Sequence, residues 1–119
     1  MNCYCDSSNN FSHCCEPYLF GYDTPVTAEQ LMRSRYTAFC LNQYDYLNQT
    51  SSVPMDGTPD TSTQWTKLTI INTANGGHND SKGTVEFNAF YTNEQQLYVH
   101  HEISYFKKHN GQWLYVGGT

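Results

Sequence analysis

The second half of the chain alternates apolar and polar residues, a pattern typical of strands with one buried face. It is clearest over 84–91, where Val85, Phe87, Ala89 and Tyr91 share a face. Three further strands are expected at 65–72, 97–107 and 112–116. Asn110-Gly111 between the last two is a strong hairpin signal. The pattern therefore predicts four antiparallel strands.

The preceding segment repeats its apolar residues at helical spacing, from about Ala28 to about Asn42. Thr27 with Gln30 fits a capping box at its start, and Thr24-Pro25 offers an alternative entry. A second helical turn is expected at 44–47, a loop at 51–63 and a linker at 16–24. Helices followed by antiparallel strands predict an α+β fold class.

Four of the five cysteines lie within the first fifteen residues, as Cys3, Cys5, Cys14 and Cys15. Two close pairs around a polar, turn-prone segment can close a tetrahedral site for one structural zinc ion. A disulfide between the adjacent Cys14 and Cys15 would be strained, which leaves two disulfide pairings open. No leader for export opens the chain, and this argues against disulfides. We favour zinc, with His13 as a solvated loop residue. Four thiolates leave no open position, so the expected metal is structural rather than catalytic.

Composition narrows the choice of function. The 119 residues carry a net charge of −5, which argues against nucleic acid as the main partner. No apolar run approaches the roughly 20 residues that span a bilayer. We therefore expect a soluble cytoplasmic protein that does not interact with membranes.

Arg35 lies on the apolar face of the predicted helix, between Leu31 and Phe39, whereas Arg33 points away from it. A buried guanidinium needs a partner, and Glu86 and Glu102 are the strand carboxylates that could supply it. Three roles stay open for Arg35: extension to the rim of the core, a buried ion pair, or binding of a carboxylate or phosphate ligand.

The remaining titratable residues give no catalytic constellation. His100 and His101 are adjacent on a strand and face opposite ways, and His100 shares its face with Glu102. Cys40 ends the apolar pattern of the helix and is expected to act as a small hydrophobic residue. No catalytic residue is assigned.

Several motifs resemble the bacterial YchJ-like family. The knuckle Cys3-x-Cys5 … Cys14-Cys15 resembles a SEC-C motif, and 31–39 (LMRSRYTAF) resembles the family signature. Similarity continues through Asp45-Tyr46-Leu47 to the tail 111–119. One difference is Asp6, where the family usually has glycine. The longer relatives also carry a second knuckle at their C-terminus, which this sequence lacks.

The resemblance implies a SEC-C-like zinc knuckle at 1–20 and an NTF2-like domain at 21–119, with helices packed in the concavity of a curved antiparallel sheet. Candidate cavity residues are Arg35, Tyr36, Trp65, Glu86, Glu102, Ser104 and Phe106. SEC-C knuckles dock to protein partners, so an accessory or protein-interaction module is the favoured function. The alternative is a small-molecule-binding protein or enzyme that uses the cavity around Arg35 and Glu102.

Overall fold

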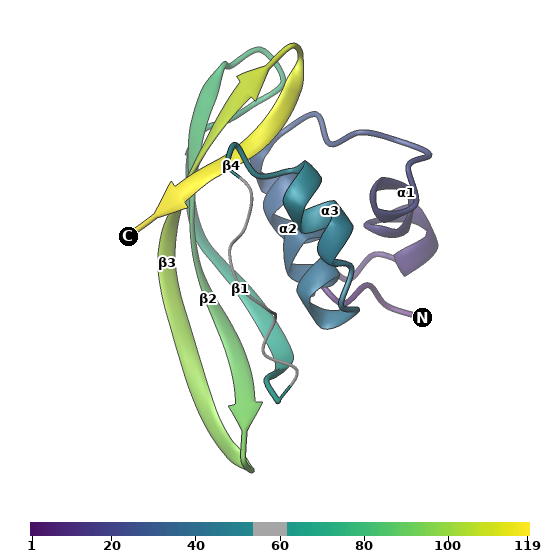
Figure 1. Cartoon of the computed structure of the whole chain (residues 1–119), viewed down its shortest axis with the longest axis vertical. Coiled ribbons are helices and arrows are strands. Elements are labelled where there is room, and N and C mark those ends of the chain that lie inside the picture. The colour runs from purple at the N-terminus through teal and green to yellow at the C-terminus, as the bar shows by residue number, and fades with distance from the viewer. Residues whose placement is uncertain (54–61) are drawn as a thin grey trace.

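The computed structural model describes residues 1–53 and 62–119 (Figure 1). In chain order the elements are a 3-10 helix η1 (Phe11–His13), helices α1 (Glu16–Leu19), α2 (Ala28–Cys40) and α3 (Tyr44–Gln49), and strands β1 (Gln64–Asn75), β2 (Lys82–Asn93), β3 (Gln96–His109) and β4 (Gln112–Gly118). The predicted order of helices before strands is confirmed, and the fold class is α+β.

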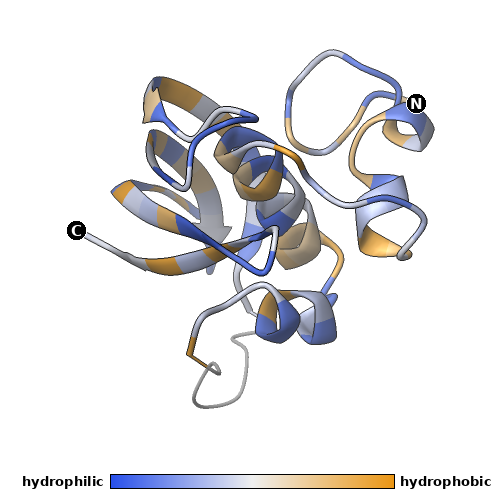
Figure 2. Cartoon of the chain, turned by 90° about the horizontal axis from the view of Figure 1, so that it is seen from above, coloured by the Kyte–Doolittle hydropathy of each residue, from blue (hydrophilic) through white to orange (hydrophobic). Residues whose placement is uncertain are grey.

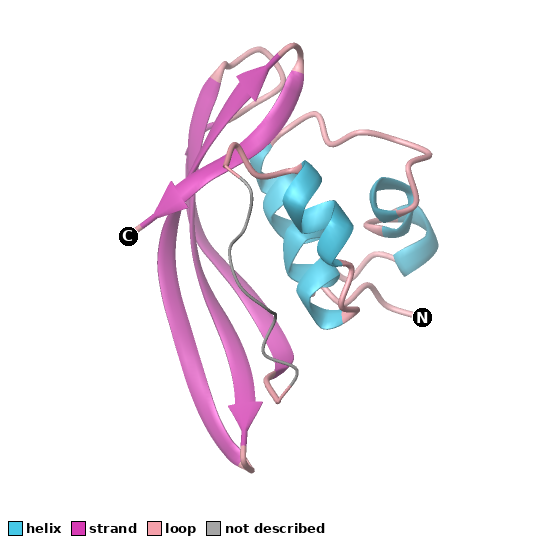
Figure 3. Cartoon of the chain, viewed as in Figure 1, coloured by secondary structure: helices cyan, strands magenta, loops and turns pink. Residues whose placement is uncertain are grey.

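The four strands form one antiparallel sheet in the order β1-β2-β3-β4. The sheet is curved, and all the helices lie on its concave side (Figures 1 and 3). α2 lies nearest the sheet, while α1 and the N-terminal segment lie behind it (Figure 1). The concave face of the sheet and one face of α2 therefore enclose the centre of the molecule.

The core follows the alternation in the sequence. Val85, Phe87 and Ala89 of β2 are buried toward the helices, as predicted. α2 buries Leu31 and Met32 against them. Figure 2 shows apolar and polar residues alternating along the strands, as expected when only one face of a sheet is covered.

Two hydrogen bonds fix the start of α2. The Thr27 side chain accepts a hydrogen bond from the Gln30 amide, which confirms the predicted cap. The Ala28 amide donates to the carbonyl of Gly76, in the turn between β1 and β2, at 2.8 Å. A Cβ at Gly83 would overlap the Gly76 backbone, so this turn closes only with glycine there.

Two segments differ from the prediction. The linker expected at 16–24 contains the short helix α1, with Pro17 in its first turn. β1 extends three residues beyond the predicted end, and two irregularities in its pairing with β2 follow Trp65 and Ile70. Most of the loop predicted at 51–63 lies outside the described residues. Across the described ranges, no helix combines the length and apolar character needed to cross a membrane.

Candidate functional site

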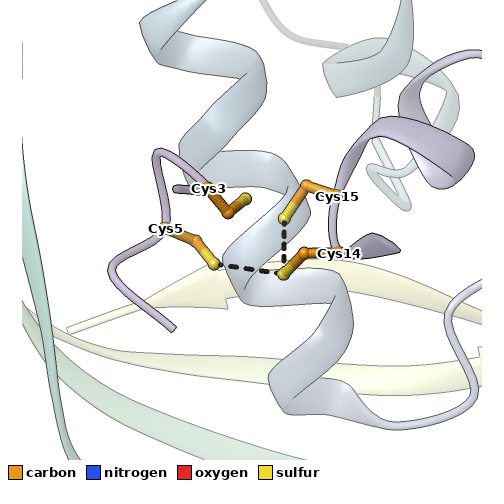
Figure 4. Close-up of side chains that lie close together, drawn as sticks. All are labelled: Cys3, Cys5, Cys14 and Cys15. Atoms are coloured by element: carbon orange, nitrogen blue, oxygen red, sulfur yellow. Dashed lines mark hydrogen bonds between the residues drawn. The ribbon is translucent and has the colours of Figure 1, made fainter. Parts of the chain in front are cut away.

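The four N-terminal cysteines converge from two segments of the chain. Cys3 and Cys5 lie on the opening loop, and Cys14 and Cys15 lie between η1 and α1, with their side chains pointing toward one another (Figure 4). All four sulfur atoms lie within 4.8 Å of one another. Cys3, Cys5 and Cys15 are buried, whereas Cys14 is half-buried.

These spacings fit a tetrahedral metal site. Sulfurs bound to one ion at about 2.3 Å lie about 3.8 Å apart in a regular tetrahedron. The Sγ atoms of Cys5 and Cys14 are 3.6 Å apart, and those of Cys14 and Cys15 are 3.9 Å apart. Little movement is therefore needed for the four sulfurs to bind one soft divalent cation.

The pKa values of the clustered thiols do not shift in one direction: hydrogen bonding to Cys15 and Cys3 lowers the pKa of Cys5. Burial raises the pKa of Cys14 to about 11. The pKa of Cys15 is raised too, first by hydrogen bonding to the sulfurs of Cys3 and Cys5 and then by burial. Adjacent thiolates repel one another, so all four ionise together only around a positive charge.

Backbone contacts hold the cysteine loop closed. An isolated bridge joins Asn2 to Asn10, and the Cys3 amide donates to the Asn9 carbonyl at 2.8 Å. Asp6 adopts φ 60°, in the left-handed region that glycine adopts most readily. Its carboxylate accepts a hydrogen bond from the Leu68 amide of β1 at 2.8 Å. Asp6 therefore ties the loop to the edge of the sheet, a contact that glycine could not make.

The cysteine cluster is part of the main core. Cys3, Cys5 and Cys15 pack in the same cluster of buried residues as Leu31 and Met32 of α2. Arg33 of α2 donates to the Cys5 carbonyl at 2.7 Å. A metal bound here would hold the N-terminal segment against the helix. His13 is exposed in η1, outside the cluster.

A second candidate site lies between α2 and the concave face of the sheet. It is a cavity of about 340 Å³. Its lining is Met32, Arg35, Tyr36 and Phe39 from α2, Trp65 from β1, Phe87 and Ala89 from β2, His100, Glu102 and Ser104 from β3, and Tyr115 from β4. The walls are mainly aromatic, and the polar groups gather on β3.

Arg35 is buried, but its hydrogen-bond acceptors are neutral. Nη1 donates to the Leu47 carbonyl at 2.9 Å and to the hydroxyls of Thr50 and Ser51 at 2.7 and 3.1 Å. The guanidinium lies 4.5 Å from the centre of the Tyr115 ring. Within the described chain, the ion pair with a sheet carboxylate, one of the three roles left open for Arg35, is not formed, and the end of α3 supplies three neutral oxygens instead. Burial lowers the pKa of Arg35 to about 10, which leaves it charged at neutral pH.

Glu102 collects the hydrogen-bond donors of the cavity. Oε1 lies 3.0 Å from Nε2 of His100, and Oε2 accepts hydrogen bonds from Ser104 and, at 3.0 Å, from the Tyr115 hydroxyl. Burial alone would raise the pKa of Glu102, but the three partners outweigh it and lower the pKa. Burial and the Glu102 charge together raise the pKa of Tyr115 to about 12. Glu102 is therefore a fixed carboxylate at the polar end of an aromatic cavity.

Two predicted cavity residues lie elsewhere. Glu86 faces the other side of the sheet, where its carboxylate lies 2.7 Å from Nε2 of His101. The alternation that directs Phe87 inward directs Glu86 outward, so Glu86 is corrected to an outer-face residue. Phe106 is buried in the core beyond the cavity, with its ring 5.8 Å from that of Tyr115.

The other predicted cavity residues, Arg35, Tyr36, Trp65, Glu102 and Ser104, all line the cavity. Sequence reasoning missed six more lining residues: Met32, Phe39, Phe87, Ala89, His100 and Tyr115. The inward face of β2 and the shared face of His100 and Glu102 were signals for three of them. Cys40 is half-buried against the core, and burial raises its pKa to about 11, as suits a hydrophobic role.

Comparison with known proteins identifies the family. Residues 27–118 match the model of the YchJ middle NTF2-like domain. A UPF0225 protein of Geobacter sulfurreducens is 37% identical over 98% of this chain and 77% of its own length. A UPF0225 protein of Corynebacterium glutamicum is 38% identical over 98% of this chain and 94% of its own length.

Two solved structures have the same overall arrangement. The solution structure of a SEC-C motif containing protein from Rhodopseudomonas palustris superposes with a TM-score of 0.85 at 31% identity, covering 100% of this chain and 98% of that one. The crystal structure of a SEC-C motif containing protein from Psychrobacter arcticus gives a TM-score of 0.78 at 25% identity, covering 98% and 81%. The chain therefore belongs to the YchJ-like family of SEC-C motif proteins.

Proposed function

We propose that this protein is a zinc-stabilised binding protein that takes a small molecule into the cavity between α2 and the sheet. The cavity of about 340 Å³, with Glu102 at its polar end, carries the proposal. Its size falls within the range of small-molecule sites, about 300–1,000 Å³, and a few convergent polar groups in an apolar lining are typical of such sites.

Zinc is the metal that best suits the four cysteines, because it accepts four thiolates without a strong demand on geometry. The supporting observation is that all four sulfurs lie within 4.8 Å of one another. Protein purified under reducing conditions without added metal should contain about one zinc per chain. Replacing Cys3 or Cys14 by serine should abolish it, while replacing the more distant Cys40 should leave it intact. A metal-free protein with four free thiols would contradict this part of the proposal.

Thermal denaturation in the presence of small-molecule libraries tests the binding function. A ligand at one hundred times its dissociation constant stabilises the folded state by about 2.7 kcal/mol. Ala89→Leu fills the cavity and should abolish the rise in melting temperature for every ligand found. Asn88→Leu, at the adjacent position on the outer face, should preserve it. Equal responses in both variants would place the ligand elsewhere.

Protein docking through the cysteine loop is the second candidate, and the loop's exposed outer side supports it. The side chains of Asn9, Asn10, Ser12 and His13 are all exposed. A photocrosslinking residue at position 13 should then capture one protein in cells. The same residue at position 95, in the turn between β2 and β3, is the control. Identical products from both positions would exclude docking through this loop.

A further inference from the structure

We infer that the cavity selects an uncharged, ring-sized ligand bearing a hydrogen-bond donor, which donates to the Glu102 carboxylate. This deepens the proposed function, on which it rests, by naming the chemical class of the ligand. The inference depends on the size of the cavity, the orientation of Glu102 and the hydrogen bonds that Nη1 of Arg35 makes to residues outside the cavity lining.

The dimensions and lining indicate a flat apolar body. An engineered cavity of about 150 Å³ accepts benzene, so a cavity of about 340 Å³ has room for roughly two fused rings. The rings of Tyr36 and Phe39 on α2 face that of Trp65, at centre-to-centre distances of 6.3 and 6.0 Å. Phe87 lines the cavity from the sheet. Aromatic walls of this kind pack against rings by offset or edge contacts.

Glu102 is the acceptor at the polar end. A carboxylate offers about four lone-pair sites, and the described partners of Glu102 are three, namely His100, Ser104 and Tyr115. Ser104 is fully buried, and Glu102 itself leaves only 17% of its side chain exposed. His100, by contrast, leaves 48% of its side chain exposed. The His100 side of the carboxylate is therefore where a ligand donor can add to this network or replace the imidazole.

An anionic ligand fits this arrangement poorly. Its charged group would lie beside the ionised Glu102 with little water to screen the repulsion. Arg35, the cation of the cavity, directs Nη1 to Leu47, Thr50 and Ser51, and the ring of Tyr115 lies against its guanidinium. Arg35 and Glu102 carry opposite charges in the same lining, so together they add no net charge to the cavity.

Calorimetric titration with three naphthalene probes tests the inference at neutral pH. The probes share one ring system and differ in the attached group: 2-naphthol donates a hydrogen bond, 2-methoxynaphthalene cannot, and 2-naphthoate is an anion. A hydrogen bond to a charged acceptor changes affinity by about tenfold or more. We expect 2-naphthol to bind at least about tenfold more tightly than either of the other two.

The outer face of the sheet supplies a matched control. Glu102→Gln removes the charge within nearly the same volume, and Glu86→Gln does the same to the other carboxylate that pairs with a histidine of β3. Glu102→Gln should reduce the preference for 2-naphthol over 2-methoxynaphthalene to about threefold or less, while Glu86→Gln should preserve it. The ranking of the three probes on the unmodified protein is informative even if Glu102→Gln fails to fold.

The possible results test the class of ligand and the small-molecule-binding function separately. Tightest binding of 2-naphthoate, or equal binding of 2-naphthol and 2-methoxynaphthalene, would overturn the inference and leave small-molecule binding standing. Failure of all three probes to bind the unmodified protein would overturn both. A preference for 2-naphthol that depends on Glu102 would support both.

Discussion

Adding one methyl group at Gly118 should displace the side chain of Glu102. A Cβ built at this position would overlap Cγ, Cδ and Oε2 of Glu102, whereas a Cβ at the adjacent Gly117 meets nothing within 4 Å. Gly118→Ala and Gly117→Ala therefore form a matched pair in the same strand. Both add the same atoms, and only the first forces the carboxylate to move.

The magnitude follows from the hydrogen bonds that Glu102 would lose. Displacing Oε2 breaks its bonds from the Ser104 and Tyr115 hydroxyls and leaves the buried Ser104 hydroxyl without its acceptor. Leaving a buried polar group unpaired costs about 1–3 kcal/mol, and the partly exposed Tyr115 adds less. We expect Gly118→Ala to lower the free energy of unfolding by about 2–3 kcal/mol, or the melting temperature by roughly 8–12 °C.

Thermal unfolding followed by circular dichroism gives the melting temperature and the free energy of unfolding of each variant. Gly117→Ala should shift the melting temperature by no more than about 2 °C, because it meets open space. Equal shifts for the two variants would refute the close packing of Glu102 on Gly118. A large loss of stability at Gly118 with the Tyr115 hydroxyl still bonded, as judged by NMR, would refute the proposed cause.

Three further predictions address separate contacts. The pKa of Glu102 is lowered in the folded state, so its ionised form adds stability at a pH above the ordinary carboxyl pKa of about 4.3. That stability is lost as the pH falls through the folded-state pKa. In urea denaturation, Glu102→Gln should therefore be less stable than the unmodified protein at pH 7, and the difference should shrink toward about pH 3. Arg35→Met keeps apolar volume but removes the hydrogen bonds from Nη1 to the Leu47 carbonyl and to the hydroxyls of Thr50 and Ser51, and chemical denaturation should show a loss of about 2–4 kcal/mol; a loss below about 1 kcal/mol would contradict this anchoring role. Gly83→Ala forces the Gly76 backbone away, so the soluble, folded yield should fall sharply, and an unchanged yield and melting temperature would contradict the close approach.

The elements that follow a simple period could be predicted from the sequence. The alternation of β2 and the cap at Thr27 depend on neighbouring residues, and the structure has both. α1 was missed because four residues are too few to show a helical period. The irregularities after Trp65 and Ile70 were also missed, since they depend on how β1 pairs with β2.

The candidate sites could also be predicted from the sequence only where the signal is local. The four cysteines lie together, and their close spacing in the sequence suggested it. The place of Arg35 on the apolar face of the helix was predicted, with its burial as one of the open roles. Its acceptors could not be predicted, because they come from the end of another helix, at Leu47, Thr50 and Ser51. Neutral backbone and hydroxyl oxygens at a helix end can satisfy a buried guanidinium as carboxylates do.

The outward position of Glu86 follows from the alternation of its strand. Adjacent strand residues face opposite ways, so a strand that buries Val85 and Phe87 must turn Glu86 outward. The contact of Tyr115 with Glu102 could not be predicted from strand alternation. It depends on the pairing of β4 with β3, which brings the hydroxyl of Tyr115 within 3.0 Å of Glu102, and no local pattern encodes that contact.

The position of a bound ligand tests the central claim most directly. Two-dimensional NMR of the ¹⁵N-labelled protein, titrated with 2-naphthol, reports each backbone amide and each indole separately. We expect the largest shifts at Trp65, Phe87, Glu102 and Tyr115, which line the cavity, and little change at the outward-facing Asn88. Shifts confined to the outer face of the sheet or to the cysteine loop, or no shifts at saturating probe, would contradict it.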